Sequence, residues 1–162
     1  MAQIVLGLGS NVLGAFHLRA GVQALRQLDP ELCLSPVYQS AAVGFSGDDF
    51  YNLVAVLHVD IALNDLTRWL SAIEAKFGRT KREARFSAKT LDIDLLTYDD
   101  LVGEFDGVSL PRDEILDNAF VLRPLSDIQP EALHPQLKKD YRSLWQELGG
   151  AMEALTPCDL SL

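Results

Sequence analysis

Cysteine is scarce in this chain of 162 residues, which contains only Cys33 and Cys158, far apart and without a nearby histidine. Two such residues form neither a disulfide framework nor a zinc-binding pattern. No apolar run approaches the ~20 residues of a membrane span. The opening stretch "MAQIVLGLGS" lacks the basic region of a signal peptide. We therefore expect a cytoplasmic protein that does not bind a membrane.

Basic residues are also few, since 14 lysines and arginines face 23 aspartates and glutamates and the net charge is −9. This balance disfavours a nucleic-acid-binding surface. The remaining composition, with 48% hydrophobic and 23% charged residues, is that of an ordinary globular protein. No repeat, low-complexity stretch or linker interrupts it. We expect residues 1–162 to form one domain with a sizeable core.

The pattern of apolar residues predicts elements in the order βαββαβ up to residue 98. The first helix is expected at about 15–28, and the second is expected to be capped by Asn64 or Asp65 and ended by Gly78. This order is typical of an α+β protein with a ferredoxin-like core, an antiparallel sheet with two helices on one face. The expected strands are 4–10, 32–40, 51–61 and 91–98. Expected to follow are a strand pair near 101–110, short helical pieces over 111–128 and a helix near 141–148.

Two aspartates interrupt the apolar stretch "KTLDIDLLTY" (89–98). Residues two apart on a strand point to the same face, so Asp92 and Asp94 project side by side while Leu91 and Ile93 enter the core. Carboxylates this close repel each other unless positive charge lies beside them. One interpretation is a solvated sheet face with salt bridges. The other is a Mg²⁺ site, because this cation takes one or two carboxylates together with phosphates and water.

The segment just before these aspartates, residues 79–89, concentrates positive charge in an otherwise acidic protein. It holds five of the 14 basic residues and a single acid, Glu83. Cations that bind phosphate oxygens, next to carboxylates that hold a bridging metal, are the parts of a phosphate-transfer site. The segment therefore favours the Mg²⁺ interpretation. Its basic residues are Arg79, Lys81, Arg82, Arg85 and Lys89.

Read together with this basic segment, "KTLDIDLL" resembles the signature R-T-L-D-[LIV]-D of the 6-hydroxymethyl-7,8-dihydropterin pyrophosphokinases. Further stretches are similar to other parts of that family, in the same order and without large gaps. We identify the chain as a divergent member, which implies a ferredoxin-like fold with extra C-terminal strands and helices. The further stretches are "LGLGSN", "VYQSAAVGFSGDDFYNLVAV", "IEAKFGR" and "LPRDEILDNAFVLRPLSDIQPE".

The resemblance implies a Mg²⁺-dependent transferase that moves pyrophosphate from ATP to 6-hydroxymethyl-7,8-dihydropterin, giving AMP and the pterin pyrophosphate for folate biosynthesis. It implies that Asp92 and Asp94 bind two Mg²⁺ ions, with Arg79 and Lys89 as further catalytic residues. ATP and the pterin alcohol are the expected partners of a monomer. The residues implied to contact the pterin are Ser40, Val43, Phe50, Asn52 and Phe120. Those implied to contact the nucleotide are Glu74, Lys81, Arg85, Phe86 and Arg112.

Several positions depart from the family pattern, mostly on the ATP side. A lysine at a phosphate site keeps the charge of arginine but loses its bidentate geometry. The departures are Phe86 for tryptophan, Lys89 for arginine, Arg112 for histidine, Asp113 for tyrosine and Asn118 for arginine.

These departures leave two alternatives to the family reaction. One is a divergent paralogue with weak activity or a different donor or pterin. The other is a non-catalytic pterin-binding module, since a fold does not determine function. The Asp92 and Asp94 pair argues against the module, because mere binding of a pterin does not require two adjacent carboxylates.

Overall fold

The computed structural model describes residues 1–41, 48–78 and 90–162. None of the helices in these ranges is long and apolar enough to cross a membrane. The strands are β1 (Ala2–Ser10), β2 (Cys33–Leu34), β3 (Val37–Ser40), β4 (Phe50–Val59), β5 (Asp92–Tyr98), β6 (Gly103–Phe105), β7 (Val108–Leu110) and β8 (Thr156–Cys158). The helices are α1 (Gly14–Leu25), α2 (Leu63–Lys76), α3 (Glu114–Asp117), α4 (Ala119–Ile128) and α5 (Tyr141–Leu148), followed by the 3-10 turn η1 (Gly149–Ala151).

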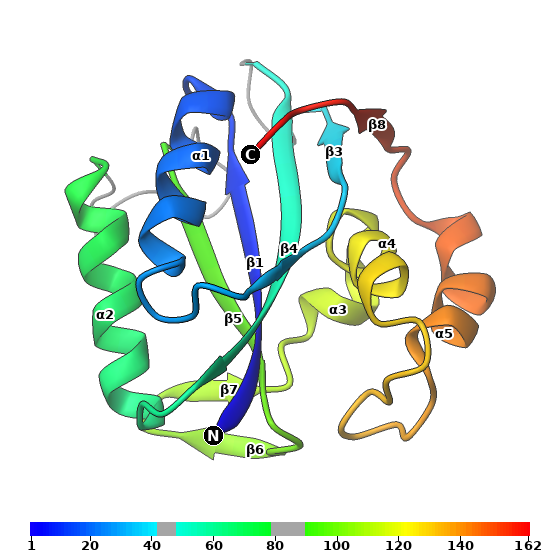
Figure 1. The fold of residues 1–162 in the computed structure, drawn as a ribbon. Helices are drawn as coiled ribbons and strands as arrows, with labels where there is room; N and C mark the ends of the chain where they lie inside the picture. Colours follow the sequence, from blue (N-terminus) through cyan, green and yellow to red (C-terminus); the bar gives the residue numbers. More distant parts are fainter. Residues whose placement is uncertain (42–47, 79–89) are drawn as a thin grey trace.

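The main sheet has the strand order β5–β1–β4–β3–β8, and β2 also pairs with β4. All of these pairs are antiparallel. The helices α1 and α2 lie on one side of this sheet, and α3, α4 and α5 lie on the other (Figure 1). The predicted α+β, ferredoxin-like core is thus confirmed, and the predicted extra strands and helices follow it along the chain.

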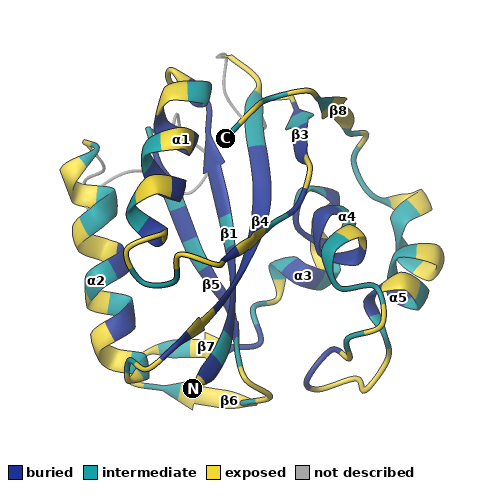
Figure 2. Cartoon of the chain, viewed as in Figure 1, coloured by how far each residue is buried: buried dark blue, intermediate teal, exposed yellow. Residues whose placement is uncertain are grey.

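Both faces of the centre of the sheet are buried, which explains why β1 and β4 are apolar at nearly every position (Figure 2). Alternate residues of a strand point to opposite faces. Ile4 and Leu6 of β1 join the core that includes residues of α1 and α2. Val5 and Val56 join the second core, which includes residues of α3, α4 and α5. The central strands therefore hold the two helical layers together.

The second face changes from apolar to polar along the strands. Val54 and Leu96 belong to the core beneath Leu122 of α4. Asn52 lies two residues from Val54, and Asp94 lies two residues from Leu96, so each points to the same face as that neighbour. The helices α3 to α5 thus cover apolar side chains at one end of this face, and polar side chains occupy the other end.

Local chemistry moves several boundaries away from the predicted ones. The strand predicted over 32–40 is divided into β2 and β3 at Pro36, which has no N–H to donate to a sheet. Helix α2 begins after Ala62 without a side-chain cap, so the prediction that Asn64 or Asp65 caps it is wrong. Gly78 follows this helix with a φ of 95°, a conformation that favours glycine, so the predicted end is confirmed.

Strand β8 was not predicted. It pairs with β3 through Val37 and Cys158, Tyr38 and Pro157, and Gln39 and Thr156. Its short sequence, Thr-Pro-Cys, carries no alternating pattern, and Pro157 is compatible with its place at the edge of the sheet.

Leu96 tests whether the second core is needed for stability. It is 1% exposed, so Leu96→Ala is expected to lower the free energy of unfolding by about 2–5 kcal/mol. Leu133→Ala is the matched control, because Leu133 is 54% exposed and a change there is expected within about 0.5 kcal/mol. Urea unfolding followed by circular dichroism measures both. Equal stabilities of the two variants would contradict the assignment.

Candidate active site

Strand pairing aligns side chains from three strands in rows across the polar end of the second face. In one row, Asp92 of β5 is opposite Gly9 of β1, and Gly9 is opposite Asn52 of β4. In the next row, Asp94 is opposite Gly7. Directly opposed residues share a face of the sheet. The two carboxylates and the amide therefore share one face, as the strand spacing predicts for the aspartates.

Gly7 and Gly9 leave a strip of bare backbone between the aspartates and Asn52. A Cβ atom at position 9 would lie 2.8 Å from Asn52 Oδ1, closer than real Cβ atoms approach a neighbour. A Cβ atom at position 7 would lie 3.5 Å from the side chain of Leu96, which is an ordinary contact. Glycine at position 9 is thus required for the observed position of the Asn52 amide.

The Asn52 amide is held from the neighbouring strand. Its Nδ2 atom donates a hydrogen bond of 3.2 Å to Ser40 Oγ, and both residues are buried. Phe50 is half-buried and pairs with Ser40 in the β3–β4 ladder, so it shares this face. Three of the residues predicted to contact a pterin are therefore neighbours in the structure.

Arg112 lies beside the aspartates. Its Nε and a terminal nitrogen donate hydrogen bonds of 3.1 and 2.9 Å to the carboxylate of Glu114, and the same terminal nitrogen lies 3.9 Å from Asp94 Oδ1. The backbone N–H of Arg112 donates to the Leu96 carbonyl over 3.0 Å, which fixes the residue against β5. The bonds to Glu114 raise the pKa of Arg112; burial opposes this, and the charges of Asp94 and Asp92 add to it.

Glu74 approaches the aspartates from α2. Its Oε2 accepts a hydrogen bond of 3.0 Å from the backbone N–H of Ile93, the residue between Asp92 and Asp94. Since β5 lies at an edge of the sheet, a backbone donor there needs a partner outside the ladder. The structure therefore gives Glu74 a direct role in fixing the strand that carries both aspartates.

Phe120 is the second residue of α4 and packs, partly buried, against the core that contains Leu96. Its backbone N–H donates a hydrogen bond of 3.1 Å to Glu153 Oε1. Asp113 and Asn118, two positions where the sequence departs from the family pattern, immediately precede α3 and α4. These departures thus occupy the starts of helices.

Six of the predicted site residues lie outside the described residues. The basic segment 79–89 is bounded by Gly78, after α2, and by Thr90. The Thr90 carbonyl accepts a hydrogen bond from Ser10 Oγ, so the chain re-enters the described fold against the end of β1 and directly before β5. The six residues are Val43, Arg79, Lys81, Arg85, Phe86 and Lys89.

The donor set on β5 fits a hard cation. Within the described part of the chain, no group of three or more histidine, cysteine, aspartate or glutamate side chains is arranged to hold a metal ion. Asp92 and Asp94 offer two carboxylates on one face, and both side chains are partly exposed. Mg²⁺ commonly takes one or two carboxylates and completes its shell with water and substrate phosphates. The pair suits a metal that arrives with a nucleotide better than a permanently bound one.

Comparison with known proteins decides the family. Residues 5–130 match the model of the 7,8-dihydro-6-hydroxymethylpterin-pyrophosphokinase family. The chain belongs to this family. The recognition made from the sequence is therefore confirmed, and the reaction expected from it, pyrophosphate transfer from ATP to 6-hydroxymethyl-7,8-dihydropterin in folate synthesis, is the reaction of this pyrophosphokinase family.

Curated relatives agree with the family model. The chain is 32% identical to a 2-amino-4-hydroxy-6-hydroxymethyldihydropteridine pyrophosphokinase of Synechocystis, over 92% of this chain and 85% of the relative. It is 33% identical to the protein of the same name from Pseudomonas aeruginosa, over 82% and 84%. Among solved structures, a Plasmodium falciparum HPPK-DHPS matches 91% of this chain with a TM-score of 0.68 at 14% identity. The chain spans 43% of that protein, and the likeness supports the fold alone.

The roles of three residues near this site, Glu114, Gly9 and Glu153, were not predicted from the sequence. Glu114 could have been predicted, because it follows Arg112 by two positions and carries the opposite charge. Gly9 could also have been predicted, since glycines at alternate positions of an apolar strand indicate a close approach. No sequence pattern indicates Glu153, because its bond to Phe120 joins residues 33 positions apart in the chain.

Gly9→Ala tests whether bare backbone is needed beside Asn52. The new methyl group would displace the Asn52 amide from Ser40, and overpacking of this kind costs about 1–3 kcal/mol of stability. Gly7→Ala is the matched control on the same strand, because its methyl group meets only an ordinary contact. Thermal unfolding and the Asn52 side-chain amide resonances measure the effect. If both variants resemble the unmodified protein, the proposed crowding at position 9 is wrong.

Proposed function

We propose that this chain carries out the family reaction on the polar end of the second sheet face, with Asp92 and Asp94 holding Mg²⁺ and Asn52 orienting the pterin. The observation that carries the proposal is the row formed by Asp92, Gly9 and Asn52. A metal-binding group and a group able to recognise a heterocycle face the same side, with a backbone floor between them. That residues 1–162 form one domain, and that the protein is a cytoplasmic monomer, remain predictions.

The pterin end of the site consists of Asn52, Ser40, Phe50 and Phe120, with Val43 as a further predicted contact. An amide offers donors and an acceptor together, which the edge of a pyrimidinone ring requires. The hydrogen bond that Asn52 donates to Ser40 orients that amide before the substrate binds. Phe50 and Phe120 are proposed to stack on the two faces of the flat ring, an arrangement that aromatic side chains favour.

The metal end consists of Asp92 and Asp94, supported by Glu74. Bound Mg²⁺ supplies positive charge to phosphate oxygens on which negative charge accumulates during transfer. Asp92 and Asp94 would hold this charge at the face of β5, and Glu74 keeps the strand between them in place through Ile93. The protein's own contribution is mainly to position the two substrates, as in other phosphoryl transfers.

Arg112 is proposed to bind the phosphates of ATP. Its guanidinium lies within 3.9 Å of Asp94 and is held by Glu114, so it can reach a nucleotide bound to the same metal. This arrangement also gives one reason to keep the divergent paralogue with an altered donor as a second candidate, because the family pattern has histidine at this position. The residues from Arg79 to Lys89 complete the predicted nucleotide site.

Asp92→Asn and Asp94→Asn test the metal assignment. Each change removes one of the two carboxylates, so AMP release from Mg²⁺, ATP and 6-hydroxymethyl-7,8-dihydropterin is expected to slow by about 100-fold or more. Asp100→Asn, in the exposed turn after β5, is expected to keep the rate. Unchanged AMP release in both site variants would refute the assignment. Pterin binding without any AMP release from the unmodified protein would instead support the binding module.

Arg112→Ala tests the phosphate contact. Loss of a charge-assisted hydrogen bond costs about 1.5–3 kcal/mol, which corresponds to an increase in the KM for ATP of roughly tenfold or more, since 1.4 kcal/mol is tenfold. The KM for the pterin is expected to stay within about twofold of that of the unmodified protein, since Ser40, Asn52 and Phe120, three of the proposed pterin contacts, lie on β3, β4 and α4. Steady-state kinetics with each substrate varied in turn measure both constants. An unaltered KM for ATP would show that Glu114 keeps Arg112 away from the nucleotide.

A further inference from the structure

The C-terminal segment, residues 149–158, runs from the end of α5 across to β3 (Figure 1). At its end, β8 forms an antiparallel ladder with β3, the strand that carries Ser40. Along its course it passes the start of α4, the helix that carries Phe120. It therefore contacts both elements that supply the proposed pterin contacts outside β4.

Glu153 makes a hydrogen bond between this segment and the start of α4. The first N–H groups of a helix have no partner within the helix, and a negative charge near them is favourable. The side chain of Asn118, at the N-cap position of α4, makes no capping hydrogen bond. Glu153 Oε1 instead accepts the hydrogen bond from the Phe120 N–H. A residue of the C-terminal segment thus does what a local cap usually does, at the residue proposed to stack on the pterin.

Polar side chains also connect β3 directly to α4. The Tyr38 hydroxyl donates to Asp127 and accepts a hydrogen bond of 3.3 Å from Arg123 Nε. The Arg123 guanidinium carbon also lies 5.8 Å from the centre of the Tyr38 ring and 5.3 Å from that of Trp145. Strand β3, helix α4 and the C-terminal segment therefore form a closed set of mutual contacts.

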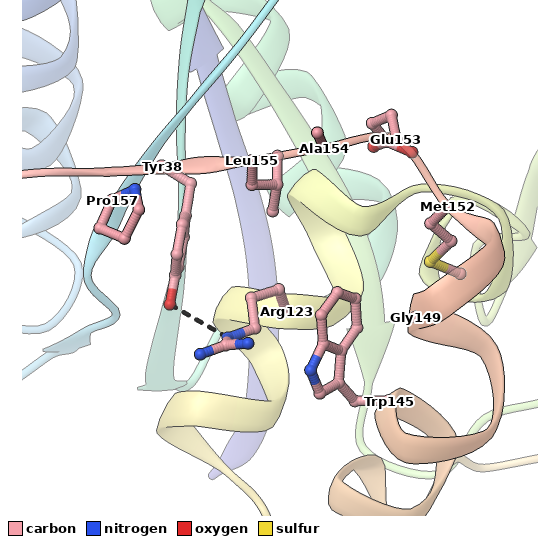
Figure 3. A pocket seen from close by; sticks show the side chains of 9 residues that line it. All are labelled: Tyr38, Arg123, Trp145, Gly149, Met152, Glu153, Ala154, Leu155 and Pro157. Carbon is pink, nitrogen blue, oxygen red and sulfur yellow. Dashed lines mark hydrogen bonds between the residues drawn. The ribbon is translucent and has the colours of Figure 1, made fainter.

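A cavity of about 390 Å³ lies between the C-terminal segment and the elements β3, α4 and α5 (Figure 3). Tyr38 of β3, Arg123 of α4 and Trp145 of α5 line it, together with Met152 and Leu155 of the segment. Met152 also packs, partly buried, against the second core. The segment is therefore held by this packing at its start, by the bond between Glu153 and Phe120, and by the β8 ladder at its end.

We propose that the C-terminal segment sets the affinity for the pterin, with Glu153 as the positioning residue for Phe120. The inference rests on the proposed function, in which Phe120 and Ser40 contact the pterin. Glu153 keeps the start of α4 in place, and β8 keeps β3 in register where Ser40 meets Asn52. The described residues of the ATP end are held by other acids, Glu74 at β5 and Glu114 at Arg112. The segment thus acts on one substrate and not on the other.

Glu153→Ala and Glu153→Gln in the full chain test this inference. Glu153→Ala removes the acceptor, so the KM for the pterin is expected to rise about tenfold, at the lower end of what one charge-assisted hydrogen bond provides. The KM for ATP is expected to stay unchanged. Glu153→Gln keeps an acceptor oxygen and is expected to recover most of the pterin affinity. Glu147→Ala is the matched control, because Glu147 pairs with Lys139 on the exposed side of α5.

Hydrogen exchange of the Phe120 amide and calorimetric binding of the pterin supply readouts that do not depend on catalysis. Relative to the unmodified protein, Glu153→Ala is expected to show faster exchange and weaker pterin binding, and Glu153→Gln is expected to come close to the unmodified values. Faster exchange with unchanged pterin binding would overturn the inference while leaving the proposed function intact. An equal loss of affinity for the pterin and for ATP would also overturn the inference, because it would indicate general structural damage. If the unmodified protein binds no pterin, the proposed function fails first, and the inference fails with it.

Discussion

Side chains on a strand alternate between two faces, and in this protein both faces of the central strands are buried at one end of the sheet. Toward the other end the same alternation places polar side chains on the second face. On the second face, Asp94 and Asp92 lie next along β5 from Leu96, and Asn52 lies next along β4 from Val54. A packed core thus fixes the strands that present the polar groups, so the geometry of the site depends on the register of three strands.

The charges around β5 are balanced by residues from different parts of the chain. Two carboxylates on adjacent positions of one face repel each other. Arg112 is close enough to offset part of this repulsion, but Glu114 binds it at the same time. Glu74 is a fourth acid nearby, and it stabilises the strand by accepting a hydrogen bond from the backbone N–H of Ile93. Among the described residues here, acids outnumber the one base, Arg112, and two carboxylates on one face suit a divalent cation.

The amino-acid sequence was sufficient for the features that depend on local patterns. The alternation over 91–98 predicts that Asp92 and Asp94 share a face, and the order of elements predicts the ferredoxin-like core. Features that depend on contacts between distant residues could not be predicted in this way. The strand β8 pairs with the edge of β3, and Glu153 reaches the start of α4 from the segment that follows α5.

The central claim is that Asp92 and Asp94 hold the metal of a metal-bound nucleotide, next to the glycines Gly7 and Gly9 that are opposite them in the sheet. Paramagnetic Mn²⁺, added with a non-hydrolysable ATP analogue, tests it by broadening the amide resonances of nearby residues. Broadening of Gly7 and Gly9 that is absent in Asp92→Asn and Asp94→Asn is the predicted result. Broadening that leaves both glycines unaffected, or that persists in the two variants, would contradict the account.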